Sequence, residues 1–155
     1  MLSKESLAIA EEFRQTFLRR YGPVEGVERL RTFDTICSAT QDRQDAMVEL
    51  LDDELDAMVV VGGYNSSNTT HLAAIATRRG VPTFHIEDAS CIDPETASIR
   101  HCPAGTKTET RVDGWLGQAT RIGITAGAST PNNKIGDTVV RICATAGEDP
   151  ALLLA

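Results

Sequence analysis

Apolar residues along the chain alternate between helical spacing and short continuous runs. Helical spacing predicts an opening helix over residues 3–20, with Gly22 and Pro23 as stop signals, and further helices over 39–53, 71–79 and 131–147. Shorter segments predict strands over 29–37, 56–61, 83–87 and 121–127. The second of these contains four consecutive apolar residues, 58–61, which is typical of a strand buried on both faces. Residues 88–119 are expected to form a long irregular stretch.

Alternation of strands and helices predicts the fold class. It favours an α/β domain with a parallel sheet and helices on both faces. In such sheets, ligands bind beyond the carboxyl ends of the strands. Three loops are expected there, DTICSATQDRQ (34–44), GGYNSSNTT (62–70) and TAGASTPNN (125–133).

Composition and charge exclude several classes of protein. The 155 residues, 41% of them apolar, can bury a core without disulfides. A net charge of −7 argues against a nucleic-acid partner or an anionic membrane surface. The chain has no apolar run of membrane-spanning length and no signal-peptide core. We therefore expect a cytoplasmic protein, or a stromal one if it comes from a plant plastid, although no transit peptide is evident.

Two of the three loops have the chemistry of a phosphate site. NSSN at 65–68 and GASTP at 127–131 carry hydroxyl and amide groups where helices are expected to begin. Free backbone N–H groups and the helix dipole favour an anion at such a place. Ser, Thr and Asn are also ordinary N-cap residues, so capping is the preferred interpretation of either loop alone, and the two loops at one sheet edge together favour a binding site.

The other polar and sulfur-containing residues are interpreted structurally. On residue type alone, every cysteine is expected to be a buried, inert thiol, and no CxxC pair is present. Histidines are expected on a helix surface or in the core rather than as proton donors, and the acidic run 52–56 as a solvated turn. Trp115 is expected to pack the 88–119 stretch onto the sheet. The cysteines and histidines are Cys37, Cys91, Cys102, Cys143, His71, His85 and His101.

Three motifs in order resemble one enzyme family. TICSATQDRQDA, VVVGGYNSSNTTHL and GITAGASTP are similar to the 4-hydroxy-3-methylbut-2-enyl diphosphate reductases, the LytB or IspH family. The stretch ending in WLGQ resembles the longer cyanobacterial and plant branch. The resemblance implies one lobe of a three-lobed α/β reductase. Residues 1–33 would then close the middle domain, 34–147 would form the third domain with an insert at 88–119, and 148–155 would be a tail.

The resemblance also implies an activity and a cofactor. Members are iron-sulfur oxidoreductases that remove the substrate's hydroxyl by a two-electron reduction, giving isopentenyl and dimethylallyl diphosphate in the methylerythritol phosphate route to isoprenoids. Electrons come from ferredoxin or flavodoxin. Three cysteines, one from each lobe, hold a 4Fe-4S cluster whose fourth iron site meets the substrate. By this resemblance Cys37 is a metal ligand, the one cluster cysteine of this chain.

Site residues follow from matching the motifs position by position. Ser66, Ser67, Asn68 and Ser129 are implied to bind the diphosphate of hydroxymethylbutenyl diphosphate. The family's other two cluster cysteines, its histidines and its proton-relay glutamate have no counterpart here. We therefore expect no catalytic residue in this chain, no activity from it alone, and a requirement for the N-terminal segment, which could be a separate chain.

Two other functions remain open from the sequence. One is a stand-alone α/β diphosphate-binding module without redox activity. The other is an unrelated nucleotide-binding domain, which ranks last because GGYNSSN lacks the glycine spacing of both common nucleotide-binding motifs.

Overall fold

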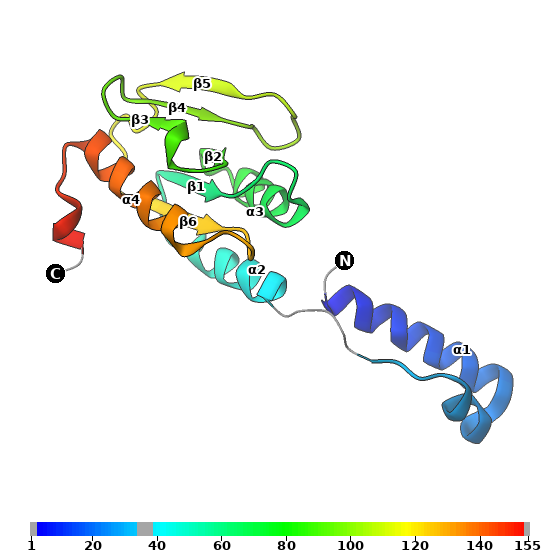
Figure 1. The fold of residues 1–155 in the computed structure, drawn as a ribbon. Helices are drawn as coiled ribbons and strands as arrows, with labels where there is room; N and C mark the ends of the chain where they lie inside the picture. Colours follow the sequence, from blue (N-terminus) through cyan, green and yellow to red (C-terminus); the bar gives the residue numbers. More distant parts are fainter. Residues whose placement is uncertain (1–2, 34–38, 154–155) are drawn as a thin grey trace. The chain divides into compact units, whose positions relative to one another are not determined.

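The computed structural model describes residues 3–33 and 39–153, which form two compact units, residues 1–42 and 43–155 (Figure 1). The first unit contains α1 (Ser3–Arg29), which is kinked at Gly22, where φ is 79° and ψ is 174°. The predicted stop at Gly22–Pro23 is therefore a kink, after which the helix resumes. Proline permits this because its fixed φ suits the first turn of a helix.

The strand predicted over 29–37 is wrong for residues 29–33. Arg29 is the last residue of α1, and residues 30–33 form no strand. The sequence pattern misled because Pro23 restarts the helix and carries it through the first residue of the expected strand. Residues 34–38, which include Cys37, lie outside the described residues.

A three-stranded parallel sheet forms the centre of the second unit. Its order is β2 (Thr83–Ile86), β1 (Ala57–Val61) and β6 (Ile122–Ala126), as Figure 1 shows. All five residues of β1 are buried, as expected for a strand covered on both faces. Val61 pairs with Ile86 on one side and with Ala126 on the other, so the three strands end at one edge.

Alternate residues of β1 point into two separate hydrophobic clusters. Met58 and Val60 pack with residues of α2 (Ala39–Leu50) and α3 (Ser67–Arg78), among them Met47 and Leu72. On the opposite face, Val59 packs in a second cluster with Ala57 and Val61 of the same strand. This cluster also contains Ile142 of α4 (Asn132–Ala146). The predicted parallel sheet with helices on both faces is therefore confirmed.

Residues 88–119 combine turns and loops with regular elements that the sequence analysis did not predict. They contain the short helix η1 (Ala89–Cys91) and an antiparallel sheet of β3 (Ile92–Asp93), β4 (Ser98–His101) and β5 (Thr110–Asp113), in that order. These strands have two to four residues and mixed polarity, too short for period-two patterning to be seen.

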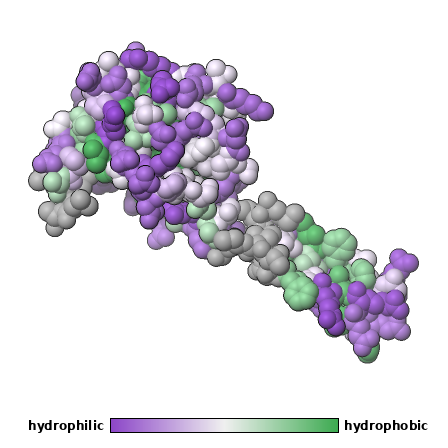
Figure 2. Space-filling model, in the orientation of Figure 1, coloured by the Kyte–Doolittle hydropathy of each residue, from purple (hydrophilic) through white to green (hydrophobic). Residues whose placement is uncertain are grey.

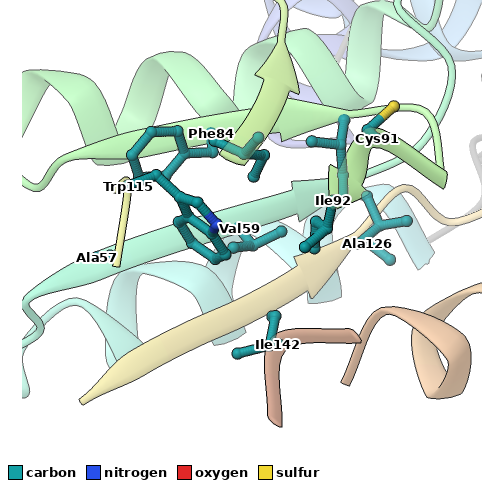
Figure 3. Close-up of a cluster of buried hydrophobic side chains, with 11 residues drawn as sticks. Ala57, Val59, Phe84, Cys91, Ile92, Trp115, Ala126 and Ile142 are labelled. Atoms are coloured by element: carbon teal, nitrogen blue, oxygen red, sulfur yellow. The ribbon is translucent and has the colours of Figure 1, made fainter. Parts of the chain in front are cut away.

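The antiparallel sheet packs on the Val59 side of the parallel sheet. Trp115, only 7% exposed, meets the Phe84 ring nearly edge-on with 5.1 Å between ring centroids (Figure 3). The backbone N–H of Cys102 donates to the carbonyl of His85 at 2.9 Å, which ties the end of β4 to β2. The structural interpretation of Trp115 is therefore confirmed.

The acidic run 52–56 is partly solvated and partly structural. Residues 52–54 are exposed, but a carboxylate oxygen of Asp56 accepts the backbone N–H groups of Thr120 and Arg121 at 2.8 and 2.9 Å. These backbone hydrogen bonds lower the pKa of Asp56. Asp56 thus joins the beginnings of β1 and β6.

The chain ends with the short helix η2 (Pro150–Leu153) after α4, which begins just after Pro131 and stops at Gly147, whose φ is 75°. Figure 2 shows hydrophilic residues over much of the visible face of the second unit. Of the helices that the structure describes, none is long and apolar enough to cross a membrane.

Candidate functional site

Two polar loops leave the parallel sheet at its carboxyl edge. The first, residues 62–68, follows β1 and contains NSSN. The second, residues 127–131, follows β6 and is GASTP. Gly62 donates its N–H to Ile86 O at 2.9 Å, and Gly127 donates to Val61 O at 3.0 Å. Because β1 and β6 are adjacent and parallel, both loops start side by side, as the sequence predicted.

Two threonines and two glycines join the loops. Thr130 donates its hydroxyl to Val61 O at 3.1 Å, which anchors the second loop to the end of the first strand. A Cβ on Gly62 would lie 2.8 Å from Thr130 Oγ1 and 2.9 Å from Thr69 Oγ1. A Cβ on Gly127 would lie 2.5 Å from Thr69 Oγ1. Only glycine at both positions lets these hydroxyls pack between the loops.

Ser66 caps the helix that follows the first loop. Its hydroxyl oxygen accepts the N–H of Thr69 at 3.3 Å, and its carbonyl accepts the N–H of Thr70 at 3.0 Å. The capping interpretation of NSSN is therefore right for Ser66. Ser67 and Ser129 are exposed, one in each loop. The proposed binding roles of all three serines stay predictions.

The amide of Asn68 is buried without a hydrogen-bond partner. Both its Oδ1 and its Nδ2 are shielded from solvent and bond to nothing among the described residues. Leaving a buried polar group unpaired costs about 1–3 kcal/mol, so such groups in native proteins usually serve a purpose. An amide at the beginning of α3 with unused donor and acceptor capacity is suited to a polar ligand.

Tyr64 and His85 contact each other at the start of the first loop. A ring nitrogen of His85, Nε2, lies 2.9 Å from Gly62 O, and the Tyr64 ring packs edge-on against the imidazole at 5.1 Å. Burial lowers the pKa of His85, which keeps it neutral, and the core position predicted for it is confirmed.

Tyr64 also bonds to the 88–119 region, a link that the sequence did not predict. Its hydroxyl donates to Glu109 Oε1 at 2.8 Å and lies 3.9 Å from Cys91 Sγ. Burial and the hydrogen bond to Glu109 raise the pKa of Tyr64. No local pattern marks this pair, because 45 residues separate its members.

Described side chains do not form a metal or cluster site on their own. No group of three or more His, Cys, Asp or Glu residues within 3–33 and 39–153 is arranged to hold a metal ion. Cys91, Cys102 and Cys143 are free and buried, as expected, and their inertness stays a prediction. Cys37 lies outside the described residues.

Known proteins match nearly the whole chain. The family model described as LytB protein matches residues 1–143. The chain is 46% identical over 144 residues to the 4-hydroxy-3-methylbut-2-enyl diphosphate reductase of Gloeobacter violaceus, and 48% identical over 143 residues to that of a Synechococcus strain. Each match covers 92% of this chain, but 34% and 35% of those proteins. The chain thus spans about a third of the length of these curated relatives.

Solved structures agree with the sequence matches. A structure of (E)-4-hydroxy-3-methyl-but-2-enyl diphosphate reductase, the terminal enzyme of the non-mevalonate pathway, superposes with a TM-score of 0.55 at 31% identity, covering 81% of this chain and 38% of that one. The Plasmodium falciparum reductase shares the fold, with a TM-score of 0.53 at 24% identity over 71% of this chain and 28% of that one. The chain therefore belongs to the LytB family of proteins.

Proposed function

We propose that this chain is the diphosphate-binding lobe of a 4-hydroxy-3-methylbut-2-enyl diphosphate reductase. Ser66, Ser67, Asn68 and Ser129 would bind the substrate's diphosphate. The observation that carries the proposal is the pair of adjacent hydroxyl- and amide-rich loops at one sheet edge, with the unpartnered Asn68 amide between α3 and the first loop.

Diphosphate recognition would rely on neutral donors. Neither loop contains lysine or arginine. Hydroxyls of Ser67 and Ser129, the Asn68 Nδ2 and the first N–H groups of α3 are all donors to phosphoryl oxygens, and the helix dipole adds a positive potential. Such a site holds an anion without neutralising the acidic chain around it.

The whole reaction is part of the same proposal. The relatives are named as reductases, and they are about three times as long as the match. We propose a two-electron reductive dehydroxylation, with a ferredoxin or flavodoxin as electron donor. We assign no proton donor for this reaction among the described residues. The proposed role of this chain is therefore to bind and orient the substrate.

A 4Fe-4S cluster belongs to the proposal only through Cys37. Thiolates are the usual cluster ligands, and the other ligands would come from elsewhere in the reductase. When the chain is expressed anaerobically together with the remaining segments of a reductase, and iron and sulfide are supplied, we expect cluster absorption to disappear in Cys37→Ser and to persist in Cys91→Ser. Equal loss in both variants, or equal retention, contradicts the assignment.

Calorimetric titration of the purified chain with the substrate or with inorganic diphosphate tests the binding lobe. Ser67→Ala and Ser129→Ala should each weaken binding roughly tenfold to a hundredfold, which is the contribution of one hydrogen bond to a charged group. Thr77→Ala is the matched control, because Thr77 lies at the far end of the same helix. A folded chain that binds no diphosphate, or loop variants that bind like Thr77→Ala, would overturn the proposal.

A stand-alone diphosphate-binding module is the second candidate. The observation that favours it is that both polar loops and the unpartnered Asn68 amide lie in this chain, whereas the chain offers a single candidate cluster ligand, Cys37. Binding of diphosphate by a protein that acquires no cluster, even when iron, sulfide and the remaining segments of a reductase are supplied, would select this function over the reductase.

A further inference from the structure

A second polar pocket lies on the antiparallel sheet and involves none of the diphosphate loops. It has a volume of about 240 Å³ and lies between η1, the strands β3, β4 and β5, and helix α4. Three arginines line it, one each from β4, β5 and α4. They are Arg100, Arg111 and Arg141. In a chain with a net charge of −7, three arginines in the lining of one pocket require an explanation.

Two of these arginines face one another across the sheet. Arg100 is the direct partner of Arg111 in the β4–β5 register. Like charges directly opposite on neighbouring strands are destabilising unless an anion lies close to both. The fold therefore places this pair where negative charge is needed.

Carboxylates of the chain meet this need incompletely. Arg100 pairs with Glu109 at 3.3 Å and Arg111 with Asp113 at 2.8 Å, but each pair lies at the surface, and Asp113 is 75% exposed. Surface pairs of this kind contribute only about 0–1 kcal/mol and exchange readily. Arg141 donates to the carbonyl of Ile92 at 3.5 Å and has no carboxylate partner among the described residues.

The lining contains more arginines than acidic residues. Asp93 is the one acidic residue in the lining, and its carboxylate oxygens accept from the Glu95 N–H at 3.0 Å and the Thr96 hydroxyl at 2.7 Å. Hydroxyls of Ser90 and Ser98 add neutral hydrogen-bonding groups. Counting Glu109 and Asp113, which pair with Arg100 and Arg111 from outside the lining, three guanidinium groups meet three carboxylates, so a bound anion would displace the two exposed carboxylates and meet the unpaired Arg141.

We propose that this arginine pocket binds a small phosphoryl anion, either free inorganic phosphate or the phosphate group of a metabolite. Guanidinium groups bind phosphate through paired N–H···O bonds, and the planar forks of Arg100, Arg111 and Arg141 approach from three elements. The volume is below the roughly 300–1,000 Å³ of sites for larger organic ligands, so a compact anion fits best.

Calorimetric titration of the full chain with inorganic phosphate tests the pocket. Arg141→Gln and Arg111→Gln should each weaken phosphate binding roughly tenfold or more, and binding should weaken as sodium chloride rises. Arg79→Gln removes an exposed arginine elsewhere and should bind phosphate like the parent. Circular dichroism shows whether each variant is folded.

The two anion sites must be told apart. Ser67→Ala changes the diphosphate loops only, so it should leave phosphate binding to the arginine pocket intact. The pocket is overturned if the folded parent binds no phosphate, if Arg141→Gln and Arg111→Gln both bind like Arg79→Gln, or if Ser67→Ala removes all binding. Comparable affinity for glycerol phosphate supports a metabolite's phosphate group as the source, and preference for inorganic phosphate supports the free anion.

Discussion

Thr69 Oγ1 fills the space that a side chain on Gly127 would need, because a Cβ built there would lie only 2.5 Å from that oxygen. Thr69 is 1% exposed and belongs to the first turn of α3, whereas Gly127 begins the loop after β6. The contact therefore fixes the spacing between the two loops of the candidate diphosphate site.

Replacing Gly127 with alanine should separate the loops. We expect Gly127→Ala to lower the free energy of unfolding by roughly 1–3 kcal/mol, as overpacking in a close-packed region does, and to weaken diphosphate binding. Chemical denaturation and calorimetry measure the two effects. In Gly136→Ala the new methyl meets open space within α4, so this control should gain up to about 1 kcal/mol.

Removing the opposing hydroxyl tests the same contact from the other side. The double variant Gly127→Ala with Thr69→Ala should lose less stability than the sum of the two single variants, because truncating Thr69 makes room for the added methyl. Additive losses would show that the two residues do not interact.

Ser66 and Ser67 should respond differently to alanine although they are neighbours. Ser66→Ala removes the N-cap bond to Thr69 and should cost about 1 kcal/mol of stability. Ser67 is exposed, so Ser67→Ala should leave the thermal midpoint nearly unchanged and weaken diphosphate binding. If Ser67→Ala instead destabilises the fold as much as Ser66→Ala, its proposed role in binding loses support.

Acid should destabilise the fold through two buried histidines. Burial lowers the pKa of His85 and also of His101, and the proximity of His85 lowers that of His101 further. The unfolded chain binds protons at about pH 6.5, where the folded chain does not. Stability is therefore full above this pH and is lost as the pH falls below it.

Denaturant unfolding at several pH values between neutral and mildly acidic measures this dependence. His85→Gln should flatten it, because glutamine does not titrate. The exposed His71 on α3 provides the control, and His71→Gln should keep the parent's slope. A parent whose stability stays constant over this range would contradict the prediction.

Alkali should act through Tyr64. Its pKa is raised in the folded state, so the unfolded chain loses a proton above about pH 10 while the folded chain keeps it. Stability from Tyr64 is thus present below this pH and is lost above it. Tyr64→Phe should lessen the alkaline loss and remove the bond to Glu109, at about 0.5–1.5 kcal/mol near neutral pH.

Glu109→Gln separates the charge of Glu109 from its hydrogen bond. Glutamine retains a carbonyl acceptor for the Tyr64 hydroxyl but no longer attracts Arg100. The stability of Glu109→Gln near neutral pH should therefore lie between the stability of the parent and that of Tyr64→Phe. A loss as large as that of Tyr64→Phe would mean that the ion pair with Arg100 contributes about as much stability as the tyrosine bond.

Local sequence patterns predicted the parallel strands and the helices that cover them. The apolar run that became β1 and the glycines and prolines near β6 and α4 were sufficient to predict the sheet, its helices and the two polar loops. Family resemblance added the roles of individual residues in those loops, which composition could not provide. The domain boundaries drawn from it remain predictions.

Long-range pairings escaped the sequence patterns. Strands β3–β5 have two to four residues each, and Ile92 and Ile99 bury them in a core shared with residues distant in the sequence, which no local periodicity encodes. The same holds for Thr69 against Gly127, since a threonine after a cap residue looks solvent-facing in sequence. At Pro23 the error was local, because a residue that ends one helix can begin the next.

The central strand finds its two neighbours at very different distances along the chain. Met58 pairs with Thr83, 25 residues later, whereas Ala57 pairs with Ile122, 65 residues later. Closing the longer loop costs more entropy, so β1, α3 and β2 should associate before β6 docks during folding. The NSSN loop should then form before the GASTP loop lies beside it. Because the proposed anion site needs both loops, we expect anion binding only after the sheet is complete.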